Sequence, residues 1–376
     1  MLKPWIKEEV FFETKRFFSH LEEHLAAAED SIDLETYIFN DDELGRRIAN
    51  QLKAAASRGV HVRVMVDGFG SPHWARDFLR PLLKAGVEAR IYHPMPLSAL
   101  SPYFEKHPSL TKFFKRISTM NERNHRKVCV VDRQKAWTGG MNISAAHMSW
   151  RDTGVFVEGS RVQDFLCAFG QAWQKAWSPR HAFHPKKRWR KFRRWIALNL
   201  VRLNSNYRAR KIAYRDLLKK ISTANHRVWV TNAYFVPPQR LRRALQAASR
   251  RNVDVKVLVP RKSDVFFIRW ISSALYFGLL TAGVKIFEYL PAPLHAKTLL
   301  IDDWATVGTT NLNHRSIIHD LEVDVVLTAV KSTEALAHRF ERDLKESKEV
   351  SITDWRQRSW RERIAGQILL FFRYWI

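Results

Sequence analysis

Hydrophobic and polar positions change their period along the chain, and the changes predict strands that alternate with helices. Residues 31–39 (SIDLETYIF) have the composition of a strand, and residues 44–59 repeat apolar positions at the spacing of an amphipathic helix. Residues 60–66 (VHVRVMV) then alternate between apolar and polar, which is typical of a half-buried strand. The first part of the chain therefore predicts a strand, a helix and a second strand.

The second half of the chain repeats this plan. The same three elements recur in the same order at residues 226–238, 241–252 and 253–260. Both halves continue with the pattern LL-x-AGV, at residues 82–87 and 279–284, and then with an aromatic strand. Strands that alternate with helices, in two copies, predict an α/β protein of two similar lobes. Each lobe is expected to be a mixed β-sheet flanked by helices, with the site at the pseudo-twofold interface between the lobes.

The chain length of 376 residues also suggests two domains. The expected parts are an N-terminal lobe over 1–178, a linker over 179–214, a C-terminal lobe over 215–348 and a tail over 349–376. The linker contains the basic run 186–203, in which seven of the nine residues from Lys186 to Arg194 are Lys or Arg. This run is either a solvated linker or, since aromatic residues interrupt it, a segment that lies on anionic headgroups.

The charge of the chain indicates what kind of partner it binds. The chain has 63 Lys and Arg against 37 Asp and Glu, a formal net charge of +26, which exceeds what solubility requires and favours an anionic partner. A hydrophobic content of 46% excludes a disordered chain. The 14 Trp and 23 Phe mixed with arginine favour a membrane surface over a nucleic-acid groove.

Two features of the sequence bear on the compartment. The two cysteines, Cys129 and Cys167, are too few for a disulfide framework or a zinc site, which suits a reducing compartment. The first residues carry charges where a signal peptide would be apolar, and neither end has a lipidation motif. We therefore expect the protein to act in the cytoplasm.

Each half of the chain contains the motif H-x-K-x4-D. The two copies are His125, Lys127 and Asp132 in the first half and His295, Lys297 and Asp302 in the second. Each copy is followed by a glycine-containing turn and an asparagine, which are Gly139, Gly140 and Asn142 in the first half and Gly308, Thr309 and Asn311 in the second. On a strand, residues i and i+2 share a face, so each half presents one imidazole and one ammonium together.

This set of side chains suits a phosphodiester. Lysine ammoniums, asparagine amides and the amides of a glycine turn donate hydrogen bonds to phosphate oxygens. One imidazole can attack phosphorus while the other protonates the leaving oxygen, because histidine titrates near neutrality. The lysines supply the positive charge that metal ions supply in other phosphodiesterases, so we expect neither a metal nor another cofactor.

At these residues the sequence resembles the phospholipase D superfamily, from about Ser31 to Val326. Within that superfamily it is most similar to the bacterial cardiolipin synthases that lack N-terminal membrane spans. The segments that carry this similarity are 232–238 (NAYFVPP), 294–316, 150–159 (WRDTGVFVEG) and 321–326 (LEVDVV).

The resemblance implies a ping-pong reaction. His125 is expected to form a phosphatidyl-histidine while His295 protonates the departing alcohol and then deprotonates the incoming one. Asp152 and Glu322 are expected to orient the histidines. The residues expected to hold the phosphate are Lys127, Lys297, Asn142 and Asn311, with the turn residues Gly139, Gly140, Gly308 and Thr309. The motif aspartates, Asp132 and Asp302, are expected to position lysine or backbone rather than to carry protons.

The two motifs are not identical. Five residues separate Asp302 from Gly308, whereas six separate Asp132 from Gly139. Thr309 stands where the superfamily usually has serine, and the corresponding residue of the first motif is Gly140, which has no hydroxyl group. The two halves of the site are therefore chemically unequal.

Two apolar segments, residues 265–284 and 368–376, favour lipid over nucleic acid as the substrate. Residues 265–284 contain one charge, but a single membrane crossing there would leave the two histidines on opposite sides of the bilayer. This segment is therefore a helix on one leaflet or an ordinary buried helix. Residues 368–376 are either a membrane anchor or a packed helix, and residues 95–116, which have no counterpart in the second half, are a lid or a surface insertion.

The sequence therefore predicts a metal-independent phosphatidyltransferase of phospholipid biosynthesis that joins phosphatidylglycerol to a second phospholipid to give cardiolipin. Its partners would be phospholipid substrates and an anionic membrane surface, as a peripheral protein on the cytoplasmic face of a bacterial inner membrane, with nucleic acid disfavoured. The alternatives are a phospholipase D-type hydrolase of phospholipid or nucleic acid, and a non-catalytic tether. The sequence does not determine the oligomeric state.

Overall fold

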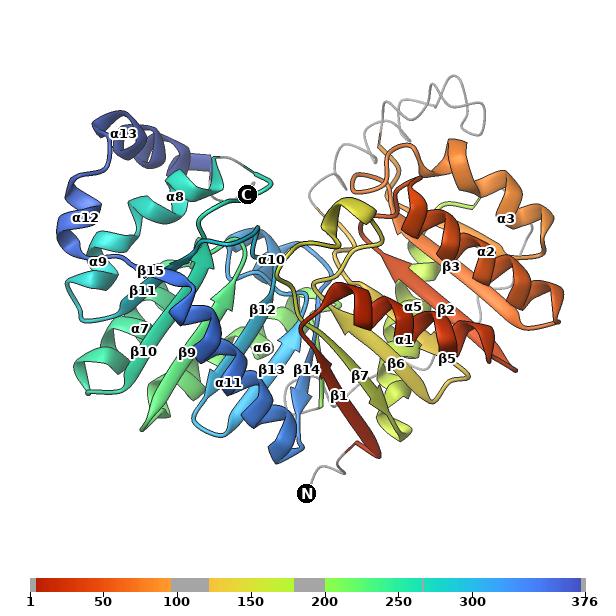
Figure 1. The fold of residues 1–376 in the computed structure, drawn as a ribbon, viewed down its shortest axis with the longest axis horizontal. Helices are drawn as coiled ribbons and strands as arrows, with labels where there is room; N and C mark the ends of the chain where they lie inside the picture. Colours follow the sequence, from red (N-terminus) through yellow and green to blue (C-terminus); the bar gives the residue numbers. More distant parts are fainter. Residues whose placement is uncertain (1–4, 96–121, 179–199, 266, 373–376) are drawn as a thin grey trace.

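Two lobes stand side by side in the computed structural model, which describes residues 5–95, 122–178, 200–265 and 267–372 (Figure 1). The expected lid or insertion at 95–116, apart from Met95, and the basic run at 186–199 lie outside the described residues.

The N-terminal lobe is a seven-stranded mixed sheet in the order β1-β7-β6-β5-β2-β3-β4. Its strands are β1 (Lys7–Phe11), β2 (Ser31–Thr36), β3 (His61–Asp67), β4 (Glu88–Tyr92), β5 (Val128–Val131), β6 (Lys135–Gly139) and β7 (Gly154–Glu158). Its helices are α1 (Thr14–Ala26), α2 (Glu43–Ser57), α3 (Arg80–Lys84) and α5 (Gln163–Lys175). Helices α1 to α3 share one hydrophobic core with one face of the sheet, and α5 packs in a second core that includes Met65 and Tyr92.

The C-terminal lobe has an eight-stranded sheet in the order β15-β11-β10-β9-β12-β13-β14-β8. Its strands are β8 (Val201–Leu203), β9 (Arg227–Asn232), β10 (Asp254–Pro260), β11 (Lys285–Tyr289), β12 (Lys297–Ile301), β13 (Trp304–Gly308), β14 (Val323–Leu327) and β15 (Ser347–Glu349). Its helices are α6 (Tyr207–Thr223), α7 (Gln239–Arg250), α8 (Ile268–Ala274), α9 (Tyr276–Leu280), α10 (His314–Ile318), α11 (Val330–Lys345), α12 (Ile352–Arg356) and α13 (Trp360–Leu369).

The two sheets repeat one arrangement of six strands. The order β7-β6-β5-β2-β3-β4 in the first lobe corresponds to β14-β13-β12-β9-β10-β11 in the second. In the first lobe β2, β3 and β4 are parallel, and in the second lobe β9, β10 and β11 are parallel. The first strand of the hairpin that follows each H-x-K motif, β5 or β12, pairs antiparallel with β2 or β9. The predicted duplicated α/β fold is therefore confirmed.

The C-terminal lobe begins earlier in the chain than the predicted boundary at residue 215. Residues 201–203, which the sequence assigned to the linker, form β8 and pair with β14 at the edge of the second sheet. Helix α6 begins at Tyr207, before the expected lobe start at residue 215. Strand β8 is only three residues long and α6 is strongly basic, so their sequences show little periodicity. Pairing with β14 defines β8, and packing of Leu217 and Ile221 in the core of the lobe defines α6.

The β5 segment is apolar throughout because both of its faces are buried. Cys129 and Val131 face the core of the first lobe, whereas Val128 and Val130 face a core that also contains residues of β13 and β14. The core that contains Val128, Val130 and residues of β13 and β14 therefore joins the two lobes. A strand that is covered on both faces has no polar positions to alternate with its apolar ones.

The apolar stretch 265–284 does not form one helix. It forms the short helices α8 and α9, and the α8 residues Ile268 and Ile271 are buried against Val236 and the end of α13. This arrangement corresponds to the packed alternative rather than to a single helix on a leaflet. Within the described ranges, every helix is too short or too polar to cross a bilayer.

A buried ion-pair group fastens the lobes together. Arg151 of the first lobe donates through Nε to Oδ2 of Asp343 in α11 at 2.8 Å, and Arg339 donates to Oδ1 of the same carboxylate at 2.8 Å. The Asp343 side chain has no solvent exposure. Removal of one partner from such a group leaves buried charge uncompensated.

We expect Asp343→Ala to lower the free energy of unfolding by about 3 to 5 kcal/mol, because two guanidiniums lose their buried carboxylate. The matched control is Asp41→Ala, which breaks an exposed pair with Arg46 and should leave the free energy of unfolding nearly unchanged. Urea unfolding of both variants measures the difference, and equal losses would contradict the fastening role.

Candidate active site

Each motif histidine is held by the backbone of the other lobe. The His125 amide donates to the Leu321 carbonyl at 3.0 Å, and the His295 amide donates to the Arg151 carbonyl at 2.8 Å. The Leu321 amide in turn donates to Arg123, and the Arg151 amide donates to Pro293. These two short bridges hold the segments just before β5 and β12 against the backbone of the other lobe.

An acid follows each bridge and bonds the histidine of the opposite lobe. Nδ1 of His125 lies 3.0 Å and 3.1 Å from the two Glu322 oxygens. Nδ1 of His295 lies 2.9 Å from Oδ2 of Asp152. All four side chains are buried. Because Nδ1 is committed to an acid, Nε2 is the ring nitrogen that each histidine offers to a ligand.

The motif lysines lie beside the histidines. Nζ of Lys127 donates to the His125 carbonyl at 2.7 Å, and Nζ of Lys297 donates to the His295 carbonyl. Both ammoniums are buried, and each retains two further protons to donate. Together with the histidines they form a compact group of four basic side chains.

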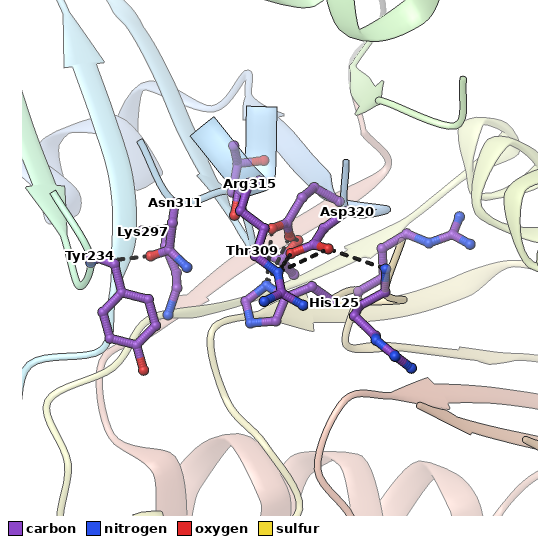
Figure 2. A network of polar contacts seen from close by, with 12 residues as sticks. His125, Tyr234, Lys297, Thr309, Asn311, Arg315 and Asp320 are labelled. Atoms are coloured by element: carbon purple, nitrogen blue, oxygen red, sulfur yellow. Dashed lines mark hydrogen bonds and ion pairs between the residues drawn. The ribbon is translucent and has the colours of Figure 1, made fainter. Parts of the chain in front are cut away.

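The asparagines brace the loops that surround this group. Oδ1 of Asn142 accepts from the Ile38 amide at 3.3 Å, and Oδ1 of Asn311 accepts from the Tyr234 amide at 3.3 Å, as Figure 2 shows for the second lobe. Because each oxygen is used in this way, the amide nitrogen is the part of each side chain that can donate to an anion.

The contacts of the turn residues explain why the first motif has Gly140 where the second has Thr309. A Cβ at Gly140 would lie 2.1 Å from Oδ1 of Asp152, so glycine is needed to admit the acid. In the second lobe Thr309 occupies the corresponding place, and its hydroxyl donates to Glu322 (Figure 2). Gly139 has a φ of 144°, which disfavours any side chain there, and a Cβ at Gly308 would meet Oδ1 of Asp324 at 2.1 Å.

The motif aspartates lie away from the histidines, at the other end of their strands. Oδ1 of Asp132 accepts from the backbone amides of residues 29–31, at 2.8 to 3.2 Å. The Asp302 carboxylate accepts from the amides of residues 225–227 in the same way. Both aspartates therefore tie the turn of a hairpin to the start of the neighbouring strand, and neither contacts the four basic side chains.

Burial and mutual repulsion lower the basicity of the site. Burial lowers the pKa of His125 well below its usual value, and the charges of Lys127 and Lys297 lower it further. Burial, followed by Lys297, also lowers the pKa of His295, with Asp152 opposing the shift. Burial lowers the pKa of Lys127 to about 7 and that of Lys297 to about 8. An anion bound among these groups would favour their protonated forms.

The two acids differ in charge near neutral pH. Burial alone would raise the pKa of Asp152, but the charge and hydrogen bond of His295 and the charge of Lys297 lower it below its ordinary value. Burial raises the pKa of Glu322 to about 7, although Lys127 opposes the shift. Asp152 is therefore ionised beside His295, whereas Glu322 is partly protonated beside His125.

Sequence reasoning missed the aromatic walls of the site. The Tyr37 ring lies 4.9 Å from the His125 ring, and Trp150 and Tyr234 lie 5.6 Å and 6.2 Å from the His295 ring. A tyrosine within two residues of the end of β2 and of the equivalent β9 was the signal that could have identified two of them.

Sequence reasoning also missed an arginine beside His125. Nε of Arg315 donates to Asp320 at 3.1 Å, and Asp320 also accepts from the Arg123 amide at 3.2 Å (Figure 2). Arg315 lies close enough to His125 for its charge to lower the pKa of that histidine. The described part of the chain contains no group of three His, Cys, Asp or Glu that could hold a metal ion.

Glu322→Gln tests the buried acid. Because burial raises its pKa from 4.5 to about 7, the stability that its proton provides is present below pH 4.5 and is lost as the pH rises through about 7. Glutamine has no such dependence. We expect the free energy of unfolding of the variant, relative to the wild type, to rise by about 3 kcal/mol between pH 4.5 and pH 8. Denaturant unfolding at both pH values measures this change, and a difference independent of pH would contradict the shift.

Known proteins are similar to this chain in sequence and in fold. Residues 21–173 and 217–344 match the family described as "Cardiolipin synthase, PLD-like domain". The chain is 30% identical over 373 residues to the cardiolipin synthase of Halalkalibacterium halodurans. This match covers 94% of this chain and 69% of that protein. The chain is 35% identical over 315 residues to cardiolipin synthase B of Escherichia coli K12, covering 81% of this chain and 72% of that protein.

Solved structures support the fold. Phosphatidylserine synthase of Haemophilus influenzae Rd KW20 superposes with a TM-score of 0.71 and 11% identity, over 100% of this chain and 97% of that one. Polyphosphate kinase of Porphyromonas gingivalis superposes with a TM-score of 0.61 and 12% identity, over 95% of this chain and 56% of that one. The family match covers both lobes and includes both His/Lys pairs, so this chain belongs to the cardiolipin synthase family of PLD-like domain proteins.

Proposed function

We propose that this protein is a metal-independent, cardiolipin synthase-type phosphatidyltransferase that works through a phosphatidyl-histidine. The observation that carries this proposal is the pair of buried His/Lys units, each completed by an acid of the other lobe. The names of the related proteins supply the substrate class. The overall reaction joins two phosphatidylglycerols into cardiolipin and releases one glycerol.

In the first step Nε2 of His125 attacks the phosphorus of the donor lipid. The bond between phosphorus and the headgroup oxygen breaks, and glycerol leaves with a proton from His295. The phosphatidyl group is then covalently bound to His125. In the second step His295 accepts the proton of an acceptor hydroxyl, whose oxygen attacks phosphorus. The bond between phosphorus and nitrogen breaks, and both histidines return to their starting states.

The unequal acids support this division of roles. A nucleophile must begin neutral, and His125 has its pKa held well below the usual value beside an acid that is itself partly protonated. A general acid must begin protonated, and the ionised Asp152 opposes the lowering of the His295 pKa by burial and by Lys297. The same two histidines with their acids exchanged would be less suited to either role.

The phosphate oxygens would be held by groups that need an anion. Lys127 and Lys297 each have spare protons and lowered pKa values, so a bound phosphate both accepts their hydrogen bonds and stabilises their charge. The amide nitrogens of Asn142 and Asn311 would add neutral donors. Water that reached the covalent intermediate instead of an alcohol would give phosphatidic acid, which is the hydrolase alternative.

We place the protein at the surface of an anionic membrane, on its cytoplasmic face. Its net charge of +26 supports attraction to a leaflet with negative surface potential. Both cysteines are free, which suits a reducing compartment. The helices in the described ranges are too short or too polar to span a bilayer.

Catalysis is tested with phosphatidylglycerol vesicles in EDTA, with lipids and glycerol quantified by mass spectrometry. We expect cardiolipin and free glycerol in equal amounts from the wild type. His125→Ala and His295→Ala should each reduce the rate by at least ~10³-fold, because each removes one of the two reacting groups. The exposed His61→Ala is the matched control. Phosphatidic acid as the main product would favour the hydrolase, and unchanged lipid would contradict both.

The roles of the two histidines are separated by a donor with a better leaving group. Phosphatidyl-p-nitrophenol releases nitrophenolate, which needs no proton from the enzyme. We therefore expect His295→Ala to give a burst of about one nitrophenolate per active site, and His125→Ala to give none. Stopped-flow absorbance measures the burst, and the reverse pattern would assign the nucleophile to His295.

A further inference from the structure

Helix α13 carries a stripe of exposed apolar side chains. The exposed fractions are 64% for Trp360, 50% for Ile364, 54% for Ile368 and 84% for Phe371. At ~100° per residue these positions fall within about 80° of the helix circumference, and the last of them continues into the following turn. A contiguous apolar stripe of large side chains on the surface is typical of an interaction site.

The opposite face of α13 is firmly packed. A Cβ at Gly366 would lie 2.4 Å from the Trp270 carbonyl oxygen, so α13 touches the backbone of α8. Glu362 accepts from Arg269 at 2.9 Å, which ties the two helices a second time. The orientation of α13 is therefore set by its neighbour, and the stripe points away from the protein.

The preceding helix, α12, is packed in the same way. The Trp355 indole donates to the Ser273 carbonyl at 2.8 Å and is buried. Arg358 donates to the Ser273 hydroxyl at 2.8 Å and to Glu288 at 2.6 Å. The exposure of the stripe is thus a property of a fixed surface rather than of a frayed end.

The stripe lies at the edge of the sheet that carries the active site. Lys297 at the start of β12 pairs with Asn232 at the end of β9, and β10 runs parallel to β9 and leads into α8. In Figure 1, α8 and α13 lie beyond this upper edge of the sheet. Packed side chains connect the active site to α13. Tyr234, whose ring contacts the His295 ring, also packs in the hydrophobic cluster that α8 forms with the end of α13.

The charges around the stripe match a lipid surface. Arg361 lies over the Trp360 ring at 5.6 Å and Arg363 lies over the Trp355 ring at 4.6 Å, and both are exposed. Exposed arginines at the border of an apolar stripe suit anionic headgroups, with the aromatic side chains at the headgroup level. The whole protein adds a net charge of +26 of the same sign.

We propose that the apolar stripe of α13 docks the protein onto an anionic phospholipid bilayer and brings the active-site edge to the lipid. The inference rests on the proposed function only in that a phospholipid substrate requires such contact. The helix would lie in the plane of the interface, with Trp360, Ile364, Ile368 and Phe371 inserted below the headgroups.

The test compares three forms of the full chain in vesicle flotation. The stripe variant combines Trp360→Ser, Ile364→Ser and Phe371→Ser. The matched control combines Ile6→Ser and Val330→Ser, whose side chains are 79% and 72% exposed elsewhere on the surface. Vesicles contain 30% phosphatidylglycerol in phosphatidylcholine. We expect the stripe variant to bind at least ~30-fold more weakly than the wild type, because each inserted side chain contributes up to roughly tenfold, and the control to bind normally.

Turnover separates docking from chemistry. The stripe variant should convert vesicle phosphatidylglycerol more slowly by a similar factor, but convert short-chain phosphatidylglycerol, dissolved below its micelle concentration, at the wild-type rate. That second rate also shows that the variant is folded. A separate variant, Arg361→Gln with Arg363→Gln, should weaken vesicle binding roughly tenfold and reduce its salt dependence.

Two outcomes would overturn the docking surface. One is vesicle binding by the stripe variant equal to that of the wild type. The other is a dimeric wild type and a monomeric stripe variant in light scattering, with vesicle binding unchanged, which would show that a second copy of the chain covers the stripe. Failure of the proposed function looks different, because the wild type would then convert neither vesicle lipid nor short-chain lipid whatever the binding result.

Discussion

The pairing of each motif histidine with the backbone and acid of the other lobe is the constraint on which the site depends. The His125 amide bonds Leu321 and its ring bonds the adjacent Glu322, and His295 is held in the same way by Arg151 and Asp152. Neither lobe alone supplies a motif histidine together with the acid that orients it. The hydrophobic core between the sheets and the buried carboxylate of Asp343 therefore serve catalysis indirectly, because they hold the two halves in register.

The cost of this arrangement is the burial of four basic groups beside one another. Burial lowers the pKa of each histidine and each lysine, and repulsion by neighbouring lysines lowers the pKa of His125, Lys127 and His295 further. A bound phosphate would supply the missing negative charge, so the site is electrostatically suited to an anionic substrate. The protonation of the two acids distinguishes the two histidines, because near neutral pH Asp152 is ionised beside His295 and Glu322 is partly protonated beside His125.

Particular residues show how far sequence reasoning reached into the site. The repeated H-x-K motif located both His/Lys pairs, and the structure brings them together with Asp152 and Glu322. The aromatic walls were missed because their side chains come from loops without a periodic pattern, and Arg315 because it lies in the five-residue helix α10, which is too short to show one. Gly140 was recognised as unusual, but its reason, the space that Asp152 occupies, appears only when the two segments are packed.

The sequence by itself determined the duplicated strand–helix–strand plan, the two motifs and the basic character of the surface, because each is written in local spacing and composition. The tertiary structure alone decided which acid serves which histidine, since the partners are 143 and 197 residues apart in the chain. It also decided that residues 265–284 form two packed helices and that α13 exposes one apolar stripe. Those outcomes depend on which faces meet other elements, and hydropathy along a chain does not specify the partner of a face.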